Sequence, residues 1–397
     1  MKMPGDYVAM LHSNPVLLED GLLRVDRKFH LGMLRYAESV KALCWTLNPG
    51  LNSGDRIMDE IRVPIDELPY QITDVPVDGK NTVSPEGLAR MRDIIGAARL
   101  TYGGGMQSYW IARELRVPFI SVQECDLATQ IMVTMEGVDS VLRKVVRAAR
   151  CIWAFRTRVI KEISGADAVH CNGFPFYDVA RRYNPNSMLY LDSRMPLDMV
   201  VSPDELETRI ASLPGRRLRL LYSGRYESIK GSVDVVKVAV ECLRRGLDLE
   251  LHCYGQGNLK SRMERLADTA AIPGRIFIHD AIPYPDLVKL ARTFDLFVCC
   301  HVQSDPSCTY LESMGAGLPI VGYANRMWQR LNEVSGVGCS SPLKDPAKVS
   351  DDIERLAGDP ATLGTMARRA AEFARQHCFE IEYGKRVDAI NAVLMKQ

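Results

Sequence analysis

Short apolar runs alternate with helical stretches along almost the whole chain, and this alternation narrows the fold more than any other feature. In the first half we expect strands near Tyr7–His12, Val40–Leu47, Gln71–Val75, Arg99–Tyr102, Pro118–Gln123, Ala168–Cys171 and Met188–Asp192. In the second half, helices near 232–245, 258–268, 284–293 and 308–315 separate the apolar runs Leu218–Ser223, Leu249–Tyr254, Arg275–Asp280, Asp295–Cys300 and Leu318–Tyr323. Strands that alternate with helices predict parallel sheets with helices on both faces. The expected fold class is therefore α/β, with doubly wound sheets.

The stretch Leu191–Pro214 is the expected connection between two domains. It carries several prolines and scattered charges, and no strand run follows it until Leu218. Such a composition is typical of an interdomain segment. We therefore expect an N-terminal domain at 1–200, a C-terminal domain at 201–377 and a last helix at about 378–397.

Composition excludes several classes of protein. The 397 residues are 47% hydrophobic and 25% charged, with a formal net charge of +1. This is an ordinary globular composition, and it gives no overall attraction to nucleic acid. The eleven cysteines are irregularly spaced and form neither a disulfide framework nor a Cys-x-x-Cys metal site. No window approaches the roughly 18 apolar residues of a membrane span. We expect a cytoplasmic protein that is neither secreted nor membrane-spanning.

The loop that follows the run Asp295–Cys300 has the features of a phosphate and ribose site. A loop at the carboxyl end of a parallel strand that opens a helix leaves backbone N–H groups unpaired, and such an end binds phosphate. We expect Ser307 or Thr309 to cap the helix, with the amides near Cys308 and Thr309 facing the anion. Glu312, about one turn in, can accept hydrogen bonds from vicinal hydroxyls such as those of a ribose. The alternative is an ordinary strand-loop-helix in which Glu312 only favours the helix dipole.

A second loop, Gly224–Gly231, follows the run Leu218–Ser223 and carries two cations. Gly224 allows a sharp turn, and Arg225 and Lys230 bring positive charge to a strand end, where a diphosphate could be held. An isolated Arg and Lys near a turn are usually solvated surface charges. Paired with the later loop, they indicate an anion site. Because both residues lie on a loop, we expect their substitution to leave folding unaffected.

With these motifs the chain resembles the nucleotide-sugar glycosyltransferases of the GT-B class, in particular the retaining enzymes of the glycosyl transferases group 1 type. The resemblance rests on a strand running into Gly-Arg-x(n)-Lys-Gly, on the loop Gly255–Gly257 after the next strand, and on Glu312 before a small-residue turn and Leu-Pro-Ile-Val. It covers about residues 217–375 well and the first half more loosely. One departure is that Ser304 stands where the family has a first Glu, with Asp305 beside it.

The resemblance implies a GT-B fold with two Rossmann-like domains and a cleft between them. The N-terminal domain would take an acceptor, and the C-terminal domain a nucleotide-diphosphate sugar such as a UDP- or GDP-sugar. The last helix would pack back on the first domain. Transfer would proceed with retention, without a cofactor and without a metal, since no Asp-x-Asp motif is present. The acceptor is left open between a glycan, a lipid-linked intermediate and a small molecule.

The resemblance also implies residue roles. Arg225 and Lys230 would hold the diphosphate and stabilise the leaving group, and Glu312 would hold the ribose. The remaining donor-side positions implied are Gly224, Gly255, Ile282, Ser304, Asp305, Ser307, Cys308 and Thr309, with Ile282 near the base. Because Ser304 replaces a carboxylate that contacts the donor sugar in the family, two alternatives stay open. One is a nucleotide-sugar-binding partner protein without turnover, and the other is a GT-B epimerase.

Three residues are candidates for the acceptor side. Gly21 lies between the first strand and the first helix, and Gly103 begins a run of three glycines at a strand end. Either glycine would allow close approach of a ligand, or would simply serve a turn. His170 ends another strand and could face the cleft with Asn172, although a lone histidine is more often a structural residue.

The stretch Val141–Glu162 reads as one amphipathic helix. Six basic residues fall on one face at 100° per residue and apolar residues fall on the other, with Arg156 within the apolar side. One interpretation is a surface helix whose apolar stripe packs on the core. The other is that the segment meets an anionic membrane, which would place the protein on the inner face of a membrane and near a lipid-linked acceptor.

Overall fold

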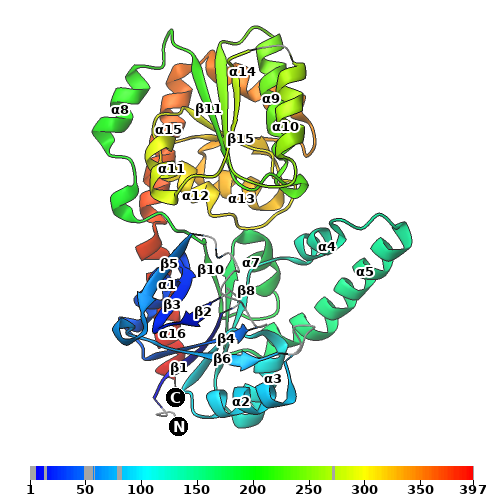
Figure 1. Cartoon of the computed structure of the whole chain (residues 1–397), viewed down its shortest axis with the longest axis vertical. Coiled ribbons are helices and arrows are strands. Elements are labelled where there is room, and N and C mark those ends of the chain that lie inside the picture. Colours follow the sequence, from blue (N-terminus) through cyan, green and yellow to red (C-terminus); the bar gives the residue numbers. More distant parts are fainter. Residues whose placement is uncertain are drawn as a thin grey trace.

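The computed structural model describes residues 6–12, 16–48, 57, 59–77, 83–270 and 273–396. Two α/β domains follow each other along the long axis of the molecule, each built on its own sheet (Figure 1). Every pairing within these two sheets is parallel. The expected α/β class with two doubly wound sheets is confirmed.

The N-terminal sheet has seven strands in the order β10-β9-β8-β7-β1-β4-β6. Their bounds agree with the expected strands to within a few residues: β1 (Val8–His12), β4 (Ala42–Asn48), β6 (Gln71–Pro76), β7 (Leu100–Tyr102), β8 (Phe119–Gln123), β9 (Ala168–Asn172) and β10 (Ser187–Tyr190). The connecting helices are α1 (Arg27–Ala37), α2 (Pro85–Gly96), α3 (Gly105–Leu115), α6 (Ile160–Gly165) and α7 (Phe174–Ala180).

Side chains that alternate along β1 fill two different cores. Val8 and Met10 pack into the core under α1, whereas Tyr7 and Ala9 pack into the core under α2, α3 and α7. Successive residues of a strand point to opposite faces of its sheet. A run of apolar residues without alternation therefore makes a strand that is covered on both faces.

A small antiparallel sheet in the first domain was not expected from the sequence. It joins β2 (Leu17–Glu19), β3 (Leu22–Asp26) and β5 (Glu60–Pro64), and a single turn, η1 (Ile65–Glu67), follows. The turn between β2 and β3 holds Asp20 at φ 51° and Gly21 at φ 75°. Two successive positive φ angles are what a two-residue hairpin of type I′ requires, and Asp-Gly is a preferred pair there. Gly21 is thus explained by the hairpin turn.

The C-terminal sheet has six strands in the order β13-β12-β11-β14-β15-β16. They are β11 (Leu218–Ser223), β12 (Leu249–Tyr254), β13 (Ile276–His279), β14 (Leu296–Cys299), β15 (Ile320–Tyr323) and β16 (Gly338–Ser341), of which the last was not expected. The helices are α8 (Pro203–Ala211), α9 (Ser232–Arg244), α10 (Lys260–Thr269), α11 (Tyr284–Ala291), α12 (Thr309–Gly315), α13 (Arg326–Ser335), α14 (Pro346–Ala357) and α15 (Pro360–Gln376). Short turns η3 (Leu197–Met199) and η4 (Ser228–Lys230) complete this half.

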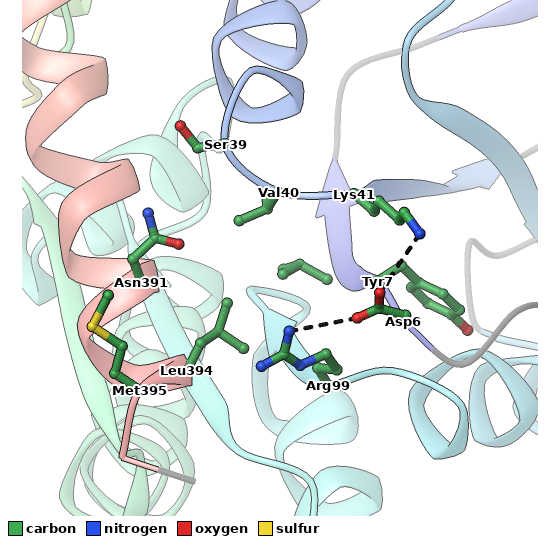
Figure 2. A pocket seen from close by; sticks show the side chains of 10 residues that line it. Asp6, Tyr7, Ser39, Val40, Lys41, Arg99, Asn391, Leu394 and Met395 are labelled. Atoms are coloured by element: carbon green, nitrogen blue, oxygen red, sulfur yellow. Dashed lines mark hydrogen bonds and ion pairs between the residues drawn. The ribbon is translucent and has the colours of Figure 1, made fainter.

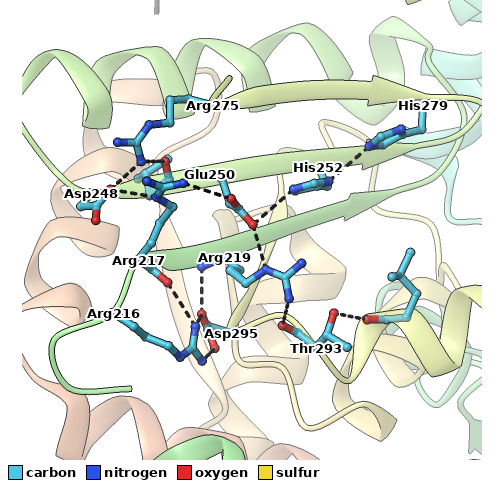
Figure 3. A network of polar contacts seen from close by, with 12 residues as sticks. Arg216, Arg217, Arg219, Asp248, Glu250, His252, Arg275, His279, Thr293 and Asp295 are labelled. Carbon is cyan, nitrogen blue, oxygen red and sulfur yellow. Dashed lines mark hydrogen bonds and ion pairs between the residues drawn. The ribbon is translucent and has the colours of Figure 1, made fainter. Parts of the chain in front are cut away.

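Ion pairs tie together the amino ends of the C-terminal strands (Figure 3). Asp295, just before β14, accepts hydrogen bonds from Arg216 at 2.5 and 2.8 Å and from the Arg219 amide at 2.8 Å. Asp248, just before β12, accepts from Arg217 at 3.0 Å and from Arg275 at 2.5 Å. This network lies at the opposite edge from the carboxyl ends, which leaves those ends to form a ligand site.

The last helix, α16 (Phe379–Leu394), packs on the N-terminal domain (Figure 1). Tyr383, Val387 and Ile390 join the core that contains Val8. A Cβ at Gly32 of α1 would lie 2.4 Å from the Tyr383 hydroxyl, so only glycine lets the two helices pack this closely. The end of the chain therefore holds the two halves of the molecule together.

An arm projects from the side of the N-terminal domain (Figure 1). It consists of α4 (Leu127–Met135) and α5 (Val141–Ala154), and a π-helical turn at Phe155–Val159 joins α5 to α6. The stretch Val141–Glu162 is therefore helical throughout, with one irregular turn. None of the helices in the described parts of the chain is long and apolar enough to cross a membrane.

Candidate active site

Lys230 and Asp305 form an ion pair at the carboxyl ends of β11 and β14. The Lys230 Nζ donates to Asp305 Oδ2 at 2.8 Å, and the two side chains are 7% and 22% exposed. Asp305 Oδ1 is buried and accepts no hydrogen bond from the residues that the structure describes. The Lys230 ammonium is thus buried and held by this carboxylate, which the sequence did not predict, so its substitution is now expected to affect folding.

Arg225 lies in the same region but stays at the surface. Its side chain is 49% exposed and donates to Glu227 at 3.0 Å. Nearby, the His301 imidazole is fully buried, and its pKa is lowered well below the usual value by burial and then by the charges of Lys230 and Arg225. Both cations therefore lie in the neighbourhood of this ring.

Glycines allow the loops around these cations to pack closely. A Cβ at Gly231 would lie 1.9 Å from the Cys300 carbonyl oxygen, and Gly231 adopts φ 60° at the start of α9. A Cβ at Gly255 would lie 1.9 Å from the Gly224 carbonyl oxygen. No side chain fits at either place, so the loops after β11, β12 and β14 meet backbone to backbone.

The start of α12 differs from the expectation. No side chain caps this helix, and Cys308 at its N-cap already has helical angles. The Ser307 hydroxyl instead lies 2.8 Å from the Thr309 hydroxyl, so neither acts as the predicted cap. Among the described residues, the backbone amides of Cys308 and Thr309 donate to no backbone carbonyl. These two amides are what the sequence expected to face an anion.

Glu312 is held by an arginine that the sequence did not single out. Arg194 Nε donates to Glu312 Oε1 at 2.5 Å, and Glu312 is 6% exposed. The Arg194 guanidinium lies 4.1 Å from the centroid of the Tyr284 ring, and the Tyr284 hydroxyl donates to the Arg194 carbonyl at 3.0 Å. Glu312 Oε2 is buried and has no hydrogen-bond partner among the described residues. One carboxylate oxygen is thus held by Arg194, and the other has no partner in the described part of the chain.

A second cluster connects the two domains at the same place. The ammonium of Lys28, from α1, donates to Asp192 Oδ2, and the Cys308 thiol donates to the same oxygen at 3.3 Å. Burial raises the pKa of the Cys308 thiol to about 12, which keeps it a neutral donor. Because Asp192 follows β10 and Cys308 opens α12, the carboxyl ends of both sheets face each other here. Sequence reasoning missed Lys28 and Asp192, which lie in unrelated stretches.

Other predicted donor positions have structural contacts of their own. The Ser304 hydroxyl accepts from the Arg326 amide at 3.1 Å, and the Arg326 guanidinium pairs with Asp126 of the N-terminal domain at 2.5 Å. Ile282 is half-buried in the loop between β13 and α11. Neither residue has a contact that assigns it to a ligand, and both roles stay predictions.

On the acceptor side, the structure separates the three candidates. Gly103 adopts φ 78° at the end of β7, near Leu11 and Val122. His170 is fully buried, and its Nδ1 lies 3.1 Å from the Tyr102 hydroxyl. His170 is therefore the buried, hydrogen-bonded structural residue that the sequence favoured, and the alternative in which it faces the cleft is wrong. Gly21 sits in its hairpin turn, where a Cβ would meet no atom within 4 Å.

A hollow elsewhere in the N-terminal domain does not belong to this site. It has a volume of about 400 Å³ and lies at the amino ends of β1 and β7, beside the last turn of α16 (Figure 2). Asp6 lies there within 3.5 Å of both Lys41 and Arg99. In open parallel sheets ligands bind at the carboxyl ends of the strands, so this hollow is not the candidate site.

Comparison with known proteins finds a family match for the C-terminal domain. The sequence model described as "Glycosyl transferases group 1" matches residues 204–377. A D-inositol 3-phosphate glycosyltransferase of Arthrobacter sp. (strain FB24) is 28% identical over 170 residues, which are 41% of this chain and 40% of that protein. The chain thus spans about two fifths of the length of the curated relatives that it matches.

Similar structures extend over the whole chain. Sucrose-phosphate synthase (tll1590) of Thermosynechococcus elongatus has a TM-score of 0.68 at 15% identity and covers 98% of this chain and 99% of its own. Anabaena HepE in complex with UDP and glucose has a TM-score of 0.62 at 11% identity, with 98% and 99% covered. At such identities the likeness shows the fold alone. The chain therefore has the GT-B fold of glycosyltransferases, and its residues 204–377 match the group 1 glycosyl transferases.

Proposed function

We propose that this chain is a glycosyltransferase that moves a sugar from a nucleoside-diphosphate sugar to an acceptor. The observation that carries the proposal is the site at the carboxyl ends of the C-terminal strands. The loops and the helix that follow these strands supply the buried Lys230, the exposed Arg225 and Glu312, of which one carboxylate oxygen has no partner among the described residues. The match to group 1 glycosyl transferases supports it, as does the UDP and glucose held by a protein of the same fold.

The site residues divide the work of holding the donor. Lys230 and Arg225 bind the diphosphate, and the phosphate oxygens take the place of the Asp305 carboxylate at the Lys230 ammonium. The same two cations stabilise the negative charge that develops as the nucleoside diphosphate leaves. Glu312 accepts the ribose hydroxyls on Oε2 while Arg194 keeps Oε1 in place. Backbone groups near Ile282 accept the base.

The catalytic arrangement relies on protein cations and on amides at the start of α12. We propose that transfer needs no metal and that it retains the anomeric configuration, in keeping with the resemblance of the motifs. Asp305 lies beside the position where the family has its first Glu. We infer that, once phosphate releases it from Lys230, its carboxylate is free to contact the donor sugar.

A panel of UDP-, GDP- and ADP-sugars tests this proposal. Binding is measured by calorimetry, nucleoside diphosphate release by a coupled assay, and the products by mass spectrometry. We expect tight binding of one nucleotide class, and release when an acceptor mixture is added. If no nucleotide sugar binds, the proposal fails. Binding without release would assign a partner protein, which Ser304 at the first Glu position favours, and a changed sugar still attached to its nucleotide would assign an epimerase.

The projecting arm of α4 and α5 bears on where in the cell this activity takes place. No residue of α5 is buried, and its apolar side chains are open to solvent: Val141 75% exposed, Leu142 74%, Val145 59%, Trp153 58%, Val146 41% and Ile152 37%. The expectation that the apolar stripe packs on the core is therefore wrong for α5. The neighbouring α4 covers the opposite side, where Arg147 donates to the Thr134 carbonyl at 2.8 Å.

We infer that this arm docks on an anionic membrane surface. An exposed apolar helix face with basic residues beside it is the pattern of helices that lie in a membrane interface. No acidic residue occurs between Val141 and Lys161, so the charge of α5 complements anionic lipid and not a basic partner. Docking through α5 would bring the N-terminal domain to a lipid-linked acceptor, and this acceptor class is our choice among those left open by the sequence.

A further inference from the structure

A second cavity opens at the carboxyl ends of the N-terminal strands, between α1 and α16. Its volume is about 90 Å³, and Leu11, Tyr102 and Val122 line it from β1, β7 and β8. Among the described residues that line it, Arg386 of α16 is the one cation and Glu124 the one anion. Nothing in the donor site uses this cavity.

Arg386 lines the cavity and lies against three tyrosine rings. Its side chain is almost fully buried, since the residue is 7% exposed. Its guanidinium carbon lies 3.6 Å from the ring centroid of Tyr383, 4.5 Å from that of Tyr190 and 5.8 Å from that of Tyr36. Nε and Nη2 have no hydrogen-bond acceptor in the described part of the chain. The ring faces attract the positive charge, but they accept none of the in-plane N–H groups.

The nearby carboxylates do not supply the missing acceptor. Asp192 is taken by the Lys28 ammonium and the Cys308 thiol. Glu124 follows the end of β8, is exposed to solvent and makes no ion pair with Arg386. A buried charge without a hydrogen-bonded partner is costly, and such groups in proteins are normally paired. The vacant Nε and Nη2 of Arg386 are therefore suited to an anion from outside the described part of the chain.

We propose that this cavity binds the phosphate or carboxylate group of the acceptor, with Arg386 as the anchoring residue. A planar guanidinium offers two parallel N–H groups, which match the two oxygens of either group. A volume of about 90 Å³ equals roughly three water molecules at about 30 Å³ each. A space of this size suits one anionic group, so the rest of the ligand would lie outside, toward the cleft.

The cavity lies close to the donor loops, so an anion bound in it would belong to the acceptor. Tyr190 of its wall ends β10, and Asp192, two residues on, contacts Cys308 at the start of α12. An acid group anchored on Arg386 would therefore place the remainder of its molecule between the two sheets, beside the donor loops. The assignment of the anion to an acceptor rests on the proposed function. The anion site itself rests only on the buried guanidinium, whose Nε and Nη2 have no acceptor among the described residues.

A purely mechanical role for Arg386 makes a different prediction. If the guanidinium only stacks on the tyrosines to hold α16, added anions leave the thermal stability unchanged at constant ionic strength. If it is a ligand site, an anion that binds the folded state alone raises the melting temperature in proportion to the logarithm of its concentration. The probe is inorganic phosphate, with acetate in a parallel series to separate phosphate from carboxylate recognition.

Variants separate this site from the donor site. We expect phosphate to raise the melting temperature of Lys230→Met, in which the donor site is impaired, and to raise that of the double variant Lys230→Met with Arg386→Met much less. UDP should still stabilise Arg386→Met, because the donor site is intact. A phosphate response that is lost in Lys230→Met and kept in Arg386→Met overturns the proposal, as does the absence of a response to both anions in the wild type. Failure of the UDP response alone would overturn the proposed function and leave this site standing.

A second variant covers the case in which Arg386→Met does not fold. Glu124→Gln changes an exposed side chain at the cavity and removes the one negative charge of its lining. We expect Glu124→Gln to bind phosphate about three- to tenfold more tightly than the wild type, because like-charge repulsion of the anion is removed. An unchanged or weaker phosphate affinity in this variant contradicts the proposal.

Discussion

Arg194 Nε lies 2.5 Å from Glu312 Oε1, and this contact ties the connection between the domains to the first turn of α12. Arg194 belongs to the segment that follows β10, whereas Glu312 belongs to the candidate donor site. The arginine is further fixed by the Tyr284 ring at 4.1 Å. The carboxylate that would hold a ribose is thus oriented by residues from outside its own helix.

Glu312→Gln is expected to lower UDP affinity by about 1.5–3 kcal/mol, the value of hydrogen bonds to a charged group. Affinity for pyrophosphate should stay unchanged, because that ligand has no ribose. Arg194→Gln is the matched control, since it breaks the same ion pair but keeps the carboxylate. Calorimetry measures the affinities of the variants for UDP and for pyrophosphate. A Glu312→Gln protein that loses thermal stability yet keeps its UDP affinity would show that Glu312 only stabilises the helix.

Lys230→Met is expected to weaken UDP binding and also to destabilise the fold. Breaking a buried ion pair costs about 3–5 kcal/mol, and the cost here should be about 2–3 kcal/mol because Asp305 is 22% exposed. Adding Asp305→Asn should restore part of the stability but none of the affinity, since the phosphate contact remains absent. Urea unfolding and UDP titration measure the two effects separately.

Two controls accompany this variant. Arg225→Ala should weaken UDP binding by about 1.5–3 kcal/mol with little effect on stability, because its side chain is 49% exposed. Lys237→Ala removes a cation from α9 that pairs with Asp234 at the surface, and it should change neither quantity by more than about 0.5 kcal/mol. Equal loss of UDP affinity in Lys237→Ala would show that the effect is general electrostatics.

The arm predicts cosedimentation with anionic vesicles. Changing Arg143, Lys144 and Arg150 to Gln should reduce the binding free energy by about 3 kcal/mol, at about 1 kcal/mol per charge near the surface. Arg147 is left in place because it holds α4. Binding should rise with the fraction of anionic lipid and fall between low and physiological salt.

Two further variants separate the contributions to membrane binding. Leu142→Ser with Trp153→Ser should reduce binding at every salt concentration, since it removes exposed apolar surface and no charge. Changing Arg244, Arg262 and Arg265 of the C-terminal domain to Gln removes the same charge away from α5 and should have no effect. If the wild type and all three variants stay equally soluble, the membrane proposal is refuted.

His170 predicts a loss of stability in acid. Burial, and then the charge of Arg386, lower the pKa of His170 to about 3, whereas an unfolded histidine titrates near pH 6.5. Above pH 6.5 both states are neutral and stability is complete. Below it the unfolded state binds a proton that the folded state does not, so stability falls by up to about 1.4 kcal/mol per pH unit. His170→Gln should flatten the pH dependence of urea unfolding between pH 6.5 and 4, and an unchanged slope would contradict the burial of a neutral ring.

Asp295→Ala is expected to destabilise the C-terminal domain by about 3–5 kcal/mol. The Asp295 side chain is fully buried, and its loss leaves Arg216 and the Arg219 amide without their acceptor (Figure 3). Asp248→Ala, in the same network but 61% exposed, should cost no more than about 1 kcal/mol. Thermal unfolding of the two variants tests the difference, and UDP affinity should be retained in both.

The strands of both sheets were predictable because buried parallel strands read as unbroken apolar runs. β11 and β12 coincide with the expected runs at Leu218 and Leu249. The hairpin of β2 and β3 was missed, although Asp20 and Gly21 between two apolar stretches are the usual signal of a two-residue turn. The predicted cap at Ser307 or Thr309 was wrong, because the two hydroxyls hydrogen-bond to each other and not to a backbone amide of α12.

The sequence alone determined which residues reach the site, since a residue that follows a parallel strand in an open α/β sheet must lie at its carboxyl edge. Lys230, Asp305 and Glu312 could be placed there from the order of strands and loops. Their partners could not, because Lys230 and Asp305 are 75 residues apart and Arg194 and Glu312 are 118 apart. The tertiary structure also decided that the apolar face of α5 is exposed, and that Nε and Nη2 of Arg386 are buried without an acceptor among the described residues. Both properties depend on which surfaces the neighbouring elements cover, and hydrophobic periodicity tells the direction of a side chain but not whether anything packs against it.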